Sequence, residues 1–169
     1  MDEPIYRHFD ICSGIGGFAL GFFQTGRIET VAFCEIDPFP RQILEARFPD
    51  VPIFSDVKGL VDEHANGSIP EFEILTAGYP CQPFSQAGKQ RAEQDPRHLW
   101  PWIAEFIAQA RPAFCLFENV YGHVALGLDN VLFDLEGQGY AARPLIIPAC
   151  GVGALHKRNR VFICARKIG

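Results

Sequence analysis

The chain has 169 residues and a formal net charge of −5, with 48% hydrophobic and 21% charged side chains. This length and composition fit one globular domain over residues 1–169 with a sizeable core, and they exclude a largely disordered chain. No apolar run approaches the roughly 20 residues of a membrane-spanning helix. The N-terminus lacks the basic and apolar regions of a secretory signal. We therefore expect a single domain without a membrane partner.

The charge is distributed unevenly along the chain. Residues 141–169 carry six basic and no acidic side chains, a charge of +6, which leaves −11 on the first 140 residues because the total is −5. A basic end on an acidic body suggests a local anion-facing surface, although solvated helix and strand ends explain the same pattern.

The six cysteines form no C-x-x-C pair, so we expect neither a metal site nor a redox dithiol. Cys12, Cys34, Cys115 and Cys164 lie in apolar, strand-like runs, where a reduced thiol packs as a small buried hydrophobe. This usage favours a reducing, intracellular compartment. Cys81 differs from these four, because it lies between prolines in a predicted turn.

Short apolar strands alternate with helices along the whole chain. In chain order, the first half predicts a strand at 8–12, a helix at 17–24, a strand at 30–35, a helix from residue 37 and a strand at 71–76. The second half predicts a helix at 100–110, a strand at 113–117, a helix at 124–135, and two closing strands at 145–147 and 161–164. This alternation is typical of an α/β fold with a doubly wound, mostly parallel sheet that helices cover on both faces.

A glycine loop follows the first predicted strand. Gly14-x-Gly16-x-x-Ala19 fits the G-x-G-x-x-G/A pattern, with a strand before it and a helix after it. Such glycines let the backbone approach a ligand at the helix N-terminus. Glu35, at the end of the second predicted strand, can accept hydrogen bonds from both hydroxyls of a ribose. The pattern favours an adenosine-containing ligand over a plain tight turn, and it leaves S-adenosylmethionine and a nicotinamide cofactor both open.

Three further features fall at the rim of the predicted sheet. Cys81 follows one strand, in a turn whose prolines would hold a thiol nucleophile rigidly, although a structural turn with an incidental cysteine is equally possible. Glu118 ends the next strand, where a carboxyl group beside an apolar wall can hold and donate a proton. Arg158 and Arg160 precede the last strand, and alternate residues of extended backbone share a face, so both can point at one anionic or carbonyl group.

With these motifs in order, the chain resembles the catalytic domain of the cytosine carbon-5 DNA methyltransferases over about residues 8–166. The resemblance is carried by four segments. Asp10 to Phe18 resembles the family's cofactor loop, and Pro80-Cys81-Gln82 resembles its nucleophile motif, with a mobile loop behind it at residues 85–90. Glu118-Asn119-Val120 matches the family's Glu-Asn-Val, and Arg158-x-Arg160 matches its Gln-x-Arg-x-Arg element with His156 in place of Gln.

The resemblance implies a Rossmann-like, S-adenosylmethionine-dependent methyltransferase domain that acts on a cytosine flipped out of DNA, as in DNA methylation and restriction–modification. Cys81 would attack carbon 6 of the ring, Glu118 would hold the ring nitrogen and amine, and Arg158 with Arg160 would stabilise the intermediate. Gln82, Ser85 and Asn119 are implied to bind the substrate. The residues implied to bind S-adenosyl-L-methionine are Cys12, Gly14, Gly16, Gly17, Glu35, Ile36, Asp56, Val57, Pro80 and Leu99.

Two departures from the family pattern shape the expected function. Cys12 stands where the family usually has Phe, which removes a stacking contact with adenine. Family members continue past the Arg motif into a target-recognition domain and a last motif, whereas this sequence stops at Gly169. We expect a catalytic portion, cytoplasmic in a prokaryote or a phage-infected host, that needs a complementing C-terminal chain or a homo-oligomer. The alternatives are a catalytically inactive S-adenosylmethionine-binding remnant or regulatory module, and a nicotinamide-dependent oxidoreductase.

Overall fold

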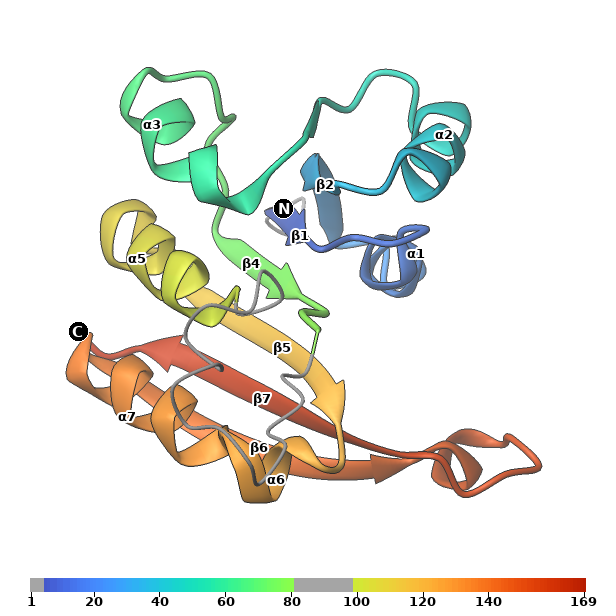
Figure 1. Cartoon of the computed structure of the whole chain (residues 1–169). Helices are drawn as coiled ribbons and strands as arrows, with labels where there is room; N and C mark the ends of the chain where they lie inside the picture. The colour runs from blue at the N-terminus through green and yellow to red at the C-terminus, as the bar shows by residue number, and fades with distance from the viewer. Residues whose placement is uncertain (1–4, 81–98) are drawn as a thin grey trace.

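The computed structural model describes residues 5–80 and 99–169, which form a seven-stranded sheet flanked by helices (Figure 1). The strand order is β3-β2-β1-β4-β5-β7-β6. All neighbouring pairs from β3 to β5 are parallel, whereas β7 runs antiparallel to both β5 and β6. The prediction of an α/β fold with a mostly parallel sheet is confirmed, and the sheet ends at one edge in an antiparallel hairpin.

The first half of the chain builds one half of the sheet and its helices. The predicted elements are present as β1 (Tyr6–Ile11), α1 (Gly17–Phe23), β2 (Ile28–Cys34), α2 (Pro38–Arg47) and β4 (Ile74–Ala77). Helix α2 starts where expected, because Asp37 accepts a hydrogen bond from the Phe39 amide at 2.9 Å and Pro38 occupies the first turn. Three short elements were not predicted: β3 (Ile53–Phe54), a 3-10 turn (Val57–Gly59) and α3 (Leu60–Ala65).

The second half contains α5 (Trp100–Ala110), β5 (Phe114–Val120), α6 (His123–Leu126), α7 (Leu128–Gly137), β6 (Tyr140–Pro148) and β7 (Asn159–Lys167). The prediction of one helix at 124–135 is wrong, because α6 and α7 separate at Gly127. A Cβ atom on Gly127 would lie 3.0 Å from Cε1 of His123. The imidazole ring therefore packs against the break, and a side chain at position 127 would require this ring to shift.

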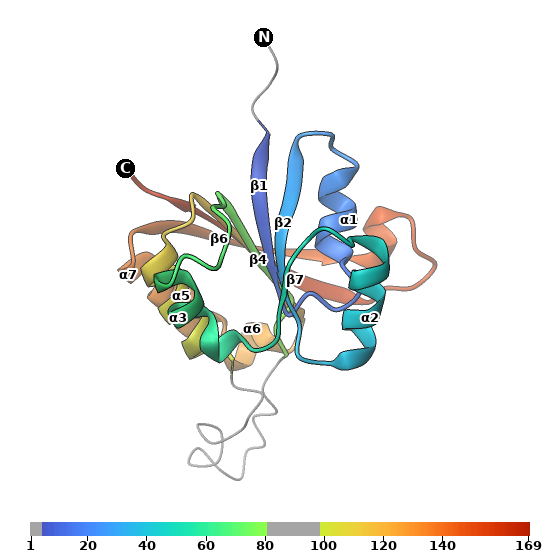
Figure 2. The same ribbon diagram turned by 90° about the horizontal axis from the view of Figure 1, so that it is seen from above.

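The helices divide between the two faces of the sheet (Figure 2). Helices α1 and α2 lie beside β1, β2 and β3, while α3, α5 and α7 lie on the opposite side. The main core includes Phe9 of β1, which is fully buried against the rings of Phe54, Phe72 and Phe106 at centroid distances of 5.9, 5.3 and 5.7 Å. Burying one such aromatic side chain stabilises the fold by about 2–3 kcal/mol.

One face of the β5–β7–β6 region is uncovered in the part of the chain that the structure describes. Phe114 is 39% exposed and Leu145 is 40% exposed on this face. The prediction that Cys164 is buried is wrong, since its thiol is on the same uncovered side. Strands of a doubly wound sheet normally bury both faces, so this surface is suited to a further packing element. We call it the open face; it consists of Phe114, Leu116, Arg143, Leu145, Phe162, Cys164 and Arg166.

Candidate active site

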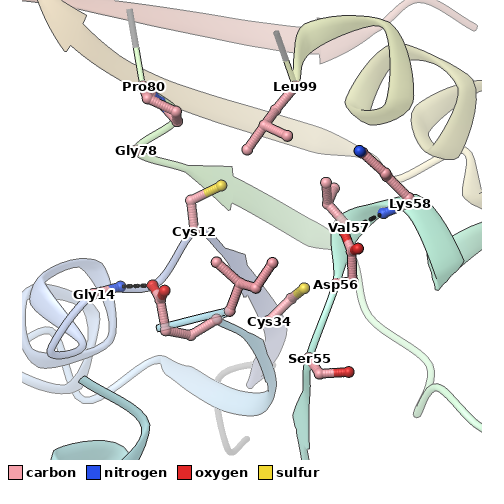
Figure 3. Close-up of a pocket in the computed structure, with 12 residues that line it drawn as sticks. Cys12, Gly14, Cys34, Ser55, Asp56, Val57, Lys58, Gly78, Pro80 and Leu99 are labelled. Atoms are coloured by element: carbon pink, nitrogen blue, oxygen red, sulfur yellow. Dashed lines mark hydrogen bonds between the residues drawn. The ribbon is translucent and has the colours of Figure 1, made fainter. Parts of the chain in front are cut away.

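A cavity of about 510 Å³ lies at the carboxyl ends of the parallel strands (Figure 3). Open α/β sheets bind ligands in this position. Eight of the ten residues predicted to bind the cofactor line it: Cys12, Gly14, Glu35, Ile36, Asp56, Val57, Pro80 and Leu99. Sequence reasoning missed four further lining residues, Cys34, Ser55, Lys58 and Gly78, although each one adjoins a predicted residue or motif.

The glycine loop borders the cavity through left-handed backbone. Cys12, Gly14 and Gly16 have φ angles of 53°, 52° and 85°. A cysteine in this region costs about 1–2 kcal/mol, a strain typical of functional loops. Gly16 and Gly17 do not line the cavity: Gly16 is the N-cap of α1 and Gly17 begins that helix. The structure therefore places these two glycines at the N-terminus of α1, outside the residues that line the cavity.

Glu35 ties the glycine loop to the end of β2. Its Oε2 accepts a hydrogen bond from the Gly14 amide at 2.7 Å, and its Oε1 accepts one from the Asp37 amide at 2.9 Å. Each carboxylate oxygen can accept two hydrogen bonds, so both keep capacity for a ribose hydroxyl. The Arg41 guanidinium supports the same turn by donating to the Glu35 carbonyl at 3.0 Å.

The rest of the cavity wall is mostly apolar. Val57 and Leu99 face each other across it, with Cys12 between them and the glycine loop (Figure 3). Burial, together with the nearby carboxylates of Glu35 and Asp10, raises the pKa of the Cys12 thiol to about 12, so this thiol stays neutral. Asp56 also lines the cavity. Its Oδ1 accepts a hydrogen bond from the Lys58 amide at 3.0 Å and so caps the 3-10 turn. A carboxylate at one end and apolar walls around it suit the ribose and the flat base of an adenosine group.

A charged pair lies at the same rim, on neighbouring strands. Arg160 Nε of β7 contacts Glu118 Oε1 of β5 at 2.5 Å, and both side chains are partly exposed. Glu118 also borders the turn after β4, since a Cβ on Gly78 would lie 3.7 Å from its Oε2. Arg158 lies in the loop just before β7 and is exposed. The structure therefore brings two of the four predicted catalytic residues into direct contact.

Cys81, the predicted nucleophile, lies outside the described residues, as do Gln82, Ser85 and the segment 85–90. The described chain stops at Pro80, beside the cavity, and resumes at Leu99, which also lines it.

Buried polar contacts hold the residue before Pro80. Asn119 is buried; its Nδ2 donates to the Tyr79 carbonyl at 3.1 Å and its Oδ1 accepts from the Val120 amide at 2.8 Å. The Tyr79 hydroxyl contacts Nε2 of His123 at 3.0 Å, and burial lowers the pKa of this histidine. Asn119 was predicted to bind substrate, which stays a prediction; its described contacts hold the Tyr79 carbonyl and the Val120 amide. No sequence motif predicted the contact between Tyr79 and His123.

Within residues 5–80 and 99–169, no three His, Cys, Asp or Glu side chains gather as metal ligands would. In the same residues, no helix combines the length and the apolar character needed to cross a membrane.

The strand order, the antiparallel β7 and the cavity at the strand ends define a Rossmann-like methyltransferase fold. The model of the family described as C-5 cytosine-specific DNA methylase matches residues 6–168, and the chain belongs to this family.

Known proteins similar to the chain are methyltransferases. It is 36% identical over 163 residues to the Type II methyltransferase M1.ScrFI of Lactococcus lactis subsp. cremoris, covering 94% of this chain and 41% of the relative. It is 36% identical over 164 residues to the Type II methyltransferase M.NgoBI of Neisseria gonorrhoeae, covering 94% of this chain and 50% of the relative. The chain thus spans half or less of the length of these relatives.

Solved structures agree on the fold. The crystal structure of a Spodoptera frugiperda DNMT2 mutant matches with a TM-score of 0.81 at 22% identity, over 96% of this chain and 50% of that one. The crystal structure of S. pombe Dnmt2 methyltransferase matches with a TM-score of 0.79 at 22% identity, over 96% of this chain and 51% of that one.

Proposed function

We propose that this chain is the cofactor-binding and catalytic portion of an enzyme that transfers a methyl group from S-adenosylmethionine to carbon 5 of cytosine in DNA. The observation that carries the proposal is the Glu118–Arg160 pair, which lies beside Gly78, a residue that lines the cavity. A nicotinamide-dependent enzyme would also bind its cofactor in such a cavity. Its chemistry gives no role to the Glu118–Arg160 ion pair, whereas methyl transfer to a cytosine does. Family membership points in the same direction.

The cavity fits the proposed cofactor. Glu35 would accept the ribose hydroxyls, Asp56 would accept the adenine amino group, and Val57 with Leu99 would enclose the base. Cys12 offers a smaller surface to the adenine than an aromatic ring would. S-adenosylmethionine, when bound, supplies the electrophilic methyl group. Pockets of a few hundred Å³ with few polar groups are typical for such ligands.

The chain's own residues would carry the chemistry on the base. The Cys81 thiolate would add to carbon 6 of a flipped cytosine, making carbon 5 nucleophilic. Glu118 would hold the ring nitrogen and exocyclic amine, with Arg160 fixing the position of its carboxylate through the ion pair. Arg158 would bind the ring carbonyl oxygen and stabilise the charge that develops there. Loss of the proton at carbon 5 and expulsion of Cys81 would complete the cycle.

We further propose that a complementing C-terminal polypeptide packs on the open face. The face combines exposed Phe114 and Leu145 with the arginines Arg143 and Arg166, so an amphipathic segment with acidic side chains complements it. The relatives contain at least as much chain again outside the matched part. DNA would be the partner of the completed protein, and an intracellular location follows from that partner.

The test is covalent trapping on duplex DNA that contains 5-fluorocytosine, with S-adenosylmethionine, in the presence and absence of a complementing C-terminal polypeptide. The fluorine blocks the final proton loss, so an adduct accumulates if Cys81 attacks. We expect an adduct with the wild type and with Cys150→Ser, a matched exposed-cysteine control, and none with Cys81→Ser. Arg158→Ala should reduce the trapping rate by about 10²–10³-fold, the effect of losing one group that stabilises developing charge.

Calorimetric titration separates the remaining alternatives. Binding of S-adenosylmethionine with no adduct under any condition would make the chain an inactive binding remnant or regulatory module. Binding of NADH alone would refute the methyltransferase assignment. An adduct that forms without the second polypeptide, from a homo-oligomer, would refute the need for a complementing chain.

A further inference from the structure

Two ring-bearing residues from distant parts of the chain share a buried hydrogen bond beside the turn that follows β4. The Tyr79 hydroxyl contacts His123 Nε2 at 3.0 Å, and the two rings meet edge to face with their centroids 5.6 Å apart. Both residues are buried. A satisfied polar contact in a buried position makes the structure around it more rigid. The proposed chemistry does not use this pair.

Tyr79 is held at both of its ends. Its backbone carbonyl accepts a hydrogen bond from Asn119 Nδ2 at 3.1 Å, and its hydroxyl contacts His123. Between these two anchors the ring packs against Trp100 and Phe117, at centroid distances of 5.6 and 6.3 Å. The position of Tyr79 is therefore defined along its whole length, from the carbonyl group to the hydroxyl group.

The position of Tyr79 is transmitted to Cys81 through a short and stiff connection. The peptide bond between Tyr79 and Pro80 is planar and trans. The ring of Pro80 fixes its φ angle at about −65°. The ψ angle of Pro80 is then the one soft torsion between the Tyr79 carbonyl and the Cys81 nitrogen. A shift of Tyr79 therefore moves the residue that the proposed function makes the nucleophile.

His123 joins the same turn to the segment that follows Glu118 and β5. It begins α6, and its carbonyl accepts a hydrogen bond from the Gly127 amide at 3.0 Å. Its ring packs against Gly127, where a Cβ atom would lie 3.0 Å from Cε1. Burial lowers the pKa of His123, which favours the neutral ring, and a tyrosine hydroxyl can bond either tautomer of a neutral imidazole. The contact thus fixes the turn after β4 relative to the segment after β5.

We propose that Tyr79 and His123 are positioning residues that set Cys81 relative to Glu118 through their shared hydrogen bond. The inference rests on the proposed function, in which Cys81 attacks carbon 6 of a cytosine while Glu118 holds the same ring. Both groups must meet one flat base, and a misplacement of about 1 Å can slow such a reaction about 100-fold. Tyr79 and His123 act through the turn and need no contact with the base.

The test measures the rate of covalent trapping on duplex DNA that contains 5-fluorocytosine, with S-adenosylmethionine, under the condition in which the wild type is trapped. Tyr79→Phe removes only the hydroxyl, and His123→Phe keeps a ring without its nitrogens. We expect each variant to lower the maximal trapping rate about 10-fold, with the half-saturating DNA concentration and the affinity for S-adenosylmethionine within about 2-fold of the wild type. The double variant should be no slower than either single variant, because the first substitution already removes the bond.

Two further variants separate positioning from a general loss of structure. His123→Gln carries an amide that can bond the Tyr79 hydroxyl, so it should be trapped faster than His123→Phe. Tyr121→Phe removes the hydroxyl of an exposed tyrosine between β5 and α6, and it should be trapped at the wild-type rate. A variant that is only less stable would lower the amount of trapped protein and leave the rate unchanged.

The outcomes distinguish this inference from the proposed function. Trapping of Tyr79→Phe and His123→Phe at the wild-type rate would overturn the inference alone. Additive losses in the double variant, or a smaller amount of trapped protein at an unchanged rate, would also overturn it, because the two residues would then act separately or only through stability. Absence of any adduct with the folded wild type would refute the proposed function and this inference with it.

Discussion

Asp10→Asn should change the pH dependence of stability in a way that the structure predicts in sign and size. Burial raises the pKa of Asp10 from 3.8 to about 7. Between these values the folded state binds the proton that the unfolded state has lost. The free energy of unfolding therefore falls by about 4 kcal/mol as the pH rises from 4 to 8 because of this group, at about 1.4 kcal/mol per unit of pKa shift.

The titration of His8 changes the free energy of unfolding in the opposite direction to that of Asp10, over nearly the same pH range. Burial lowers its pKa from 6.5 to about 3, so the unfolded state binds more protons between these values. Its contribution to stability is complete above pH 6.5 and is lost as the pH falls toward 3, by about 5 kcal/mol. In the wild type the two slopes largely cancel. Removing Asp10 should expose the rising slope of His8.

The change in the free energy of unfolding caused by Asp10→Asn also includes the cost of burying the new side-chain amide. The Asn side chain would bury an NH₂ group where Oδ2 of Asp10 has no partner, which costs about 1–3 kcal/mol. Asp10→Asn should therefore be less stable than the wild type by about 1–3 kcal/mol at pH 4, and more stable by a similar amount at pH 8. Urea unfolding followed by circular dichroism under reducing conditions measures both values. A difference between variant and wild type that stays the same at the two pH values would refute the assignment of a buried, titrating Asp10.

Three other substitutions test local features. Gly127→Ala should lower the free energy of unfolding by about 1–3 kcal/mol through its clash with His123, and adding His123→Ala should recover part of this loss; no recovery would exclude the clash as the cause. Trp100→Phe should cost about 2 kcal/mol in chemical denaturation, because its indole donates to Asp134 at 2.8 Å, and Trp100→Phe should add little in an Asp134→Ala background. Gly16→Ala should cost about 1–3 kcal/mol at φ 85° and weaken S-adenosylmethionine binding in calorimetry, whereas unchanged affinity would separate this turn from the cavity.

Local patterns were sufficient for most of the fold. The helix over Trp100–Ala110 has the predicted bounds, since apolar spacing and a proline in its first turn are properties of adjacent residues. The G-x-G loop and its acid led to Gly14 and Glu35, and the resemblance to the methyltransferase family led to the six other predicted residues that line the cavity. These signals are readable because each depends on a few neighbouring positions. Elements as short as β3 and α3 carry too few residues to show a period, which is why they were missed.

Contacts between distant segments depended on the tertiary structure. The apolar helical pattern continues through Gly127, whereas the packing of the His123 ring against the break is a contact that only the structure shows. Pairing of Glu118 with Arg160 required knowing that β7 inserts antiparallel beside β5. Cys164 is exposed because none of the described elements covers this side of β7, and composition cannot reveal which face of a strand is covered.

The mostly parallel α/β sheet inferred from the alternation of apolar strands and helices is present. The burial of Asp10 and its link to His8 through Thr76 arise only when β1, β2 and β4 lie side by side. Periodicity reports which face a residue belongs to, whereas the dielectric and the partners around a charge are set by the packing of strands that are far apart in the chain.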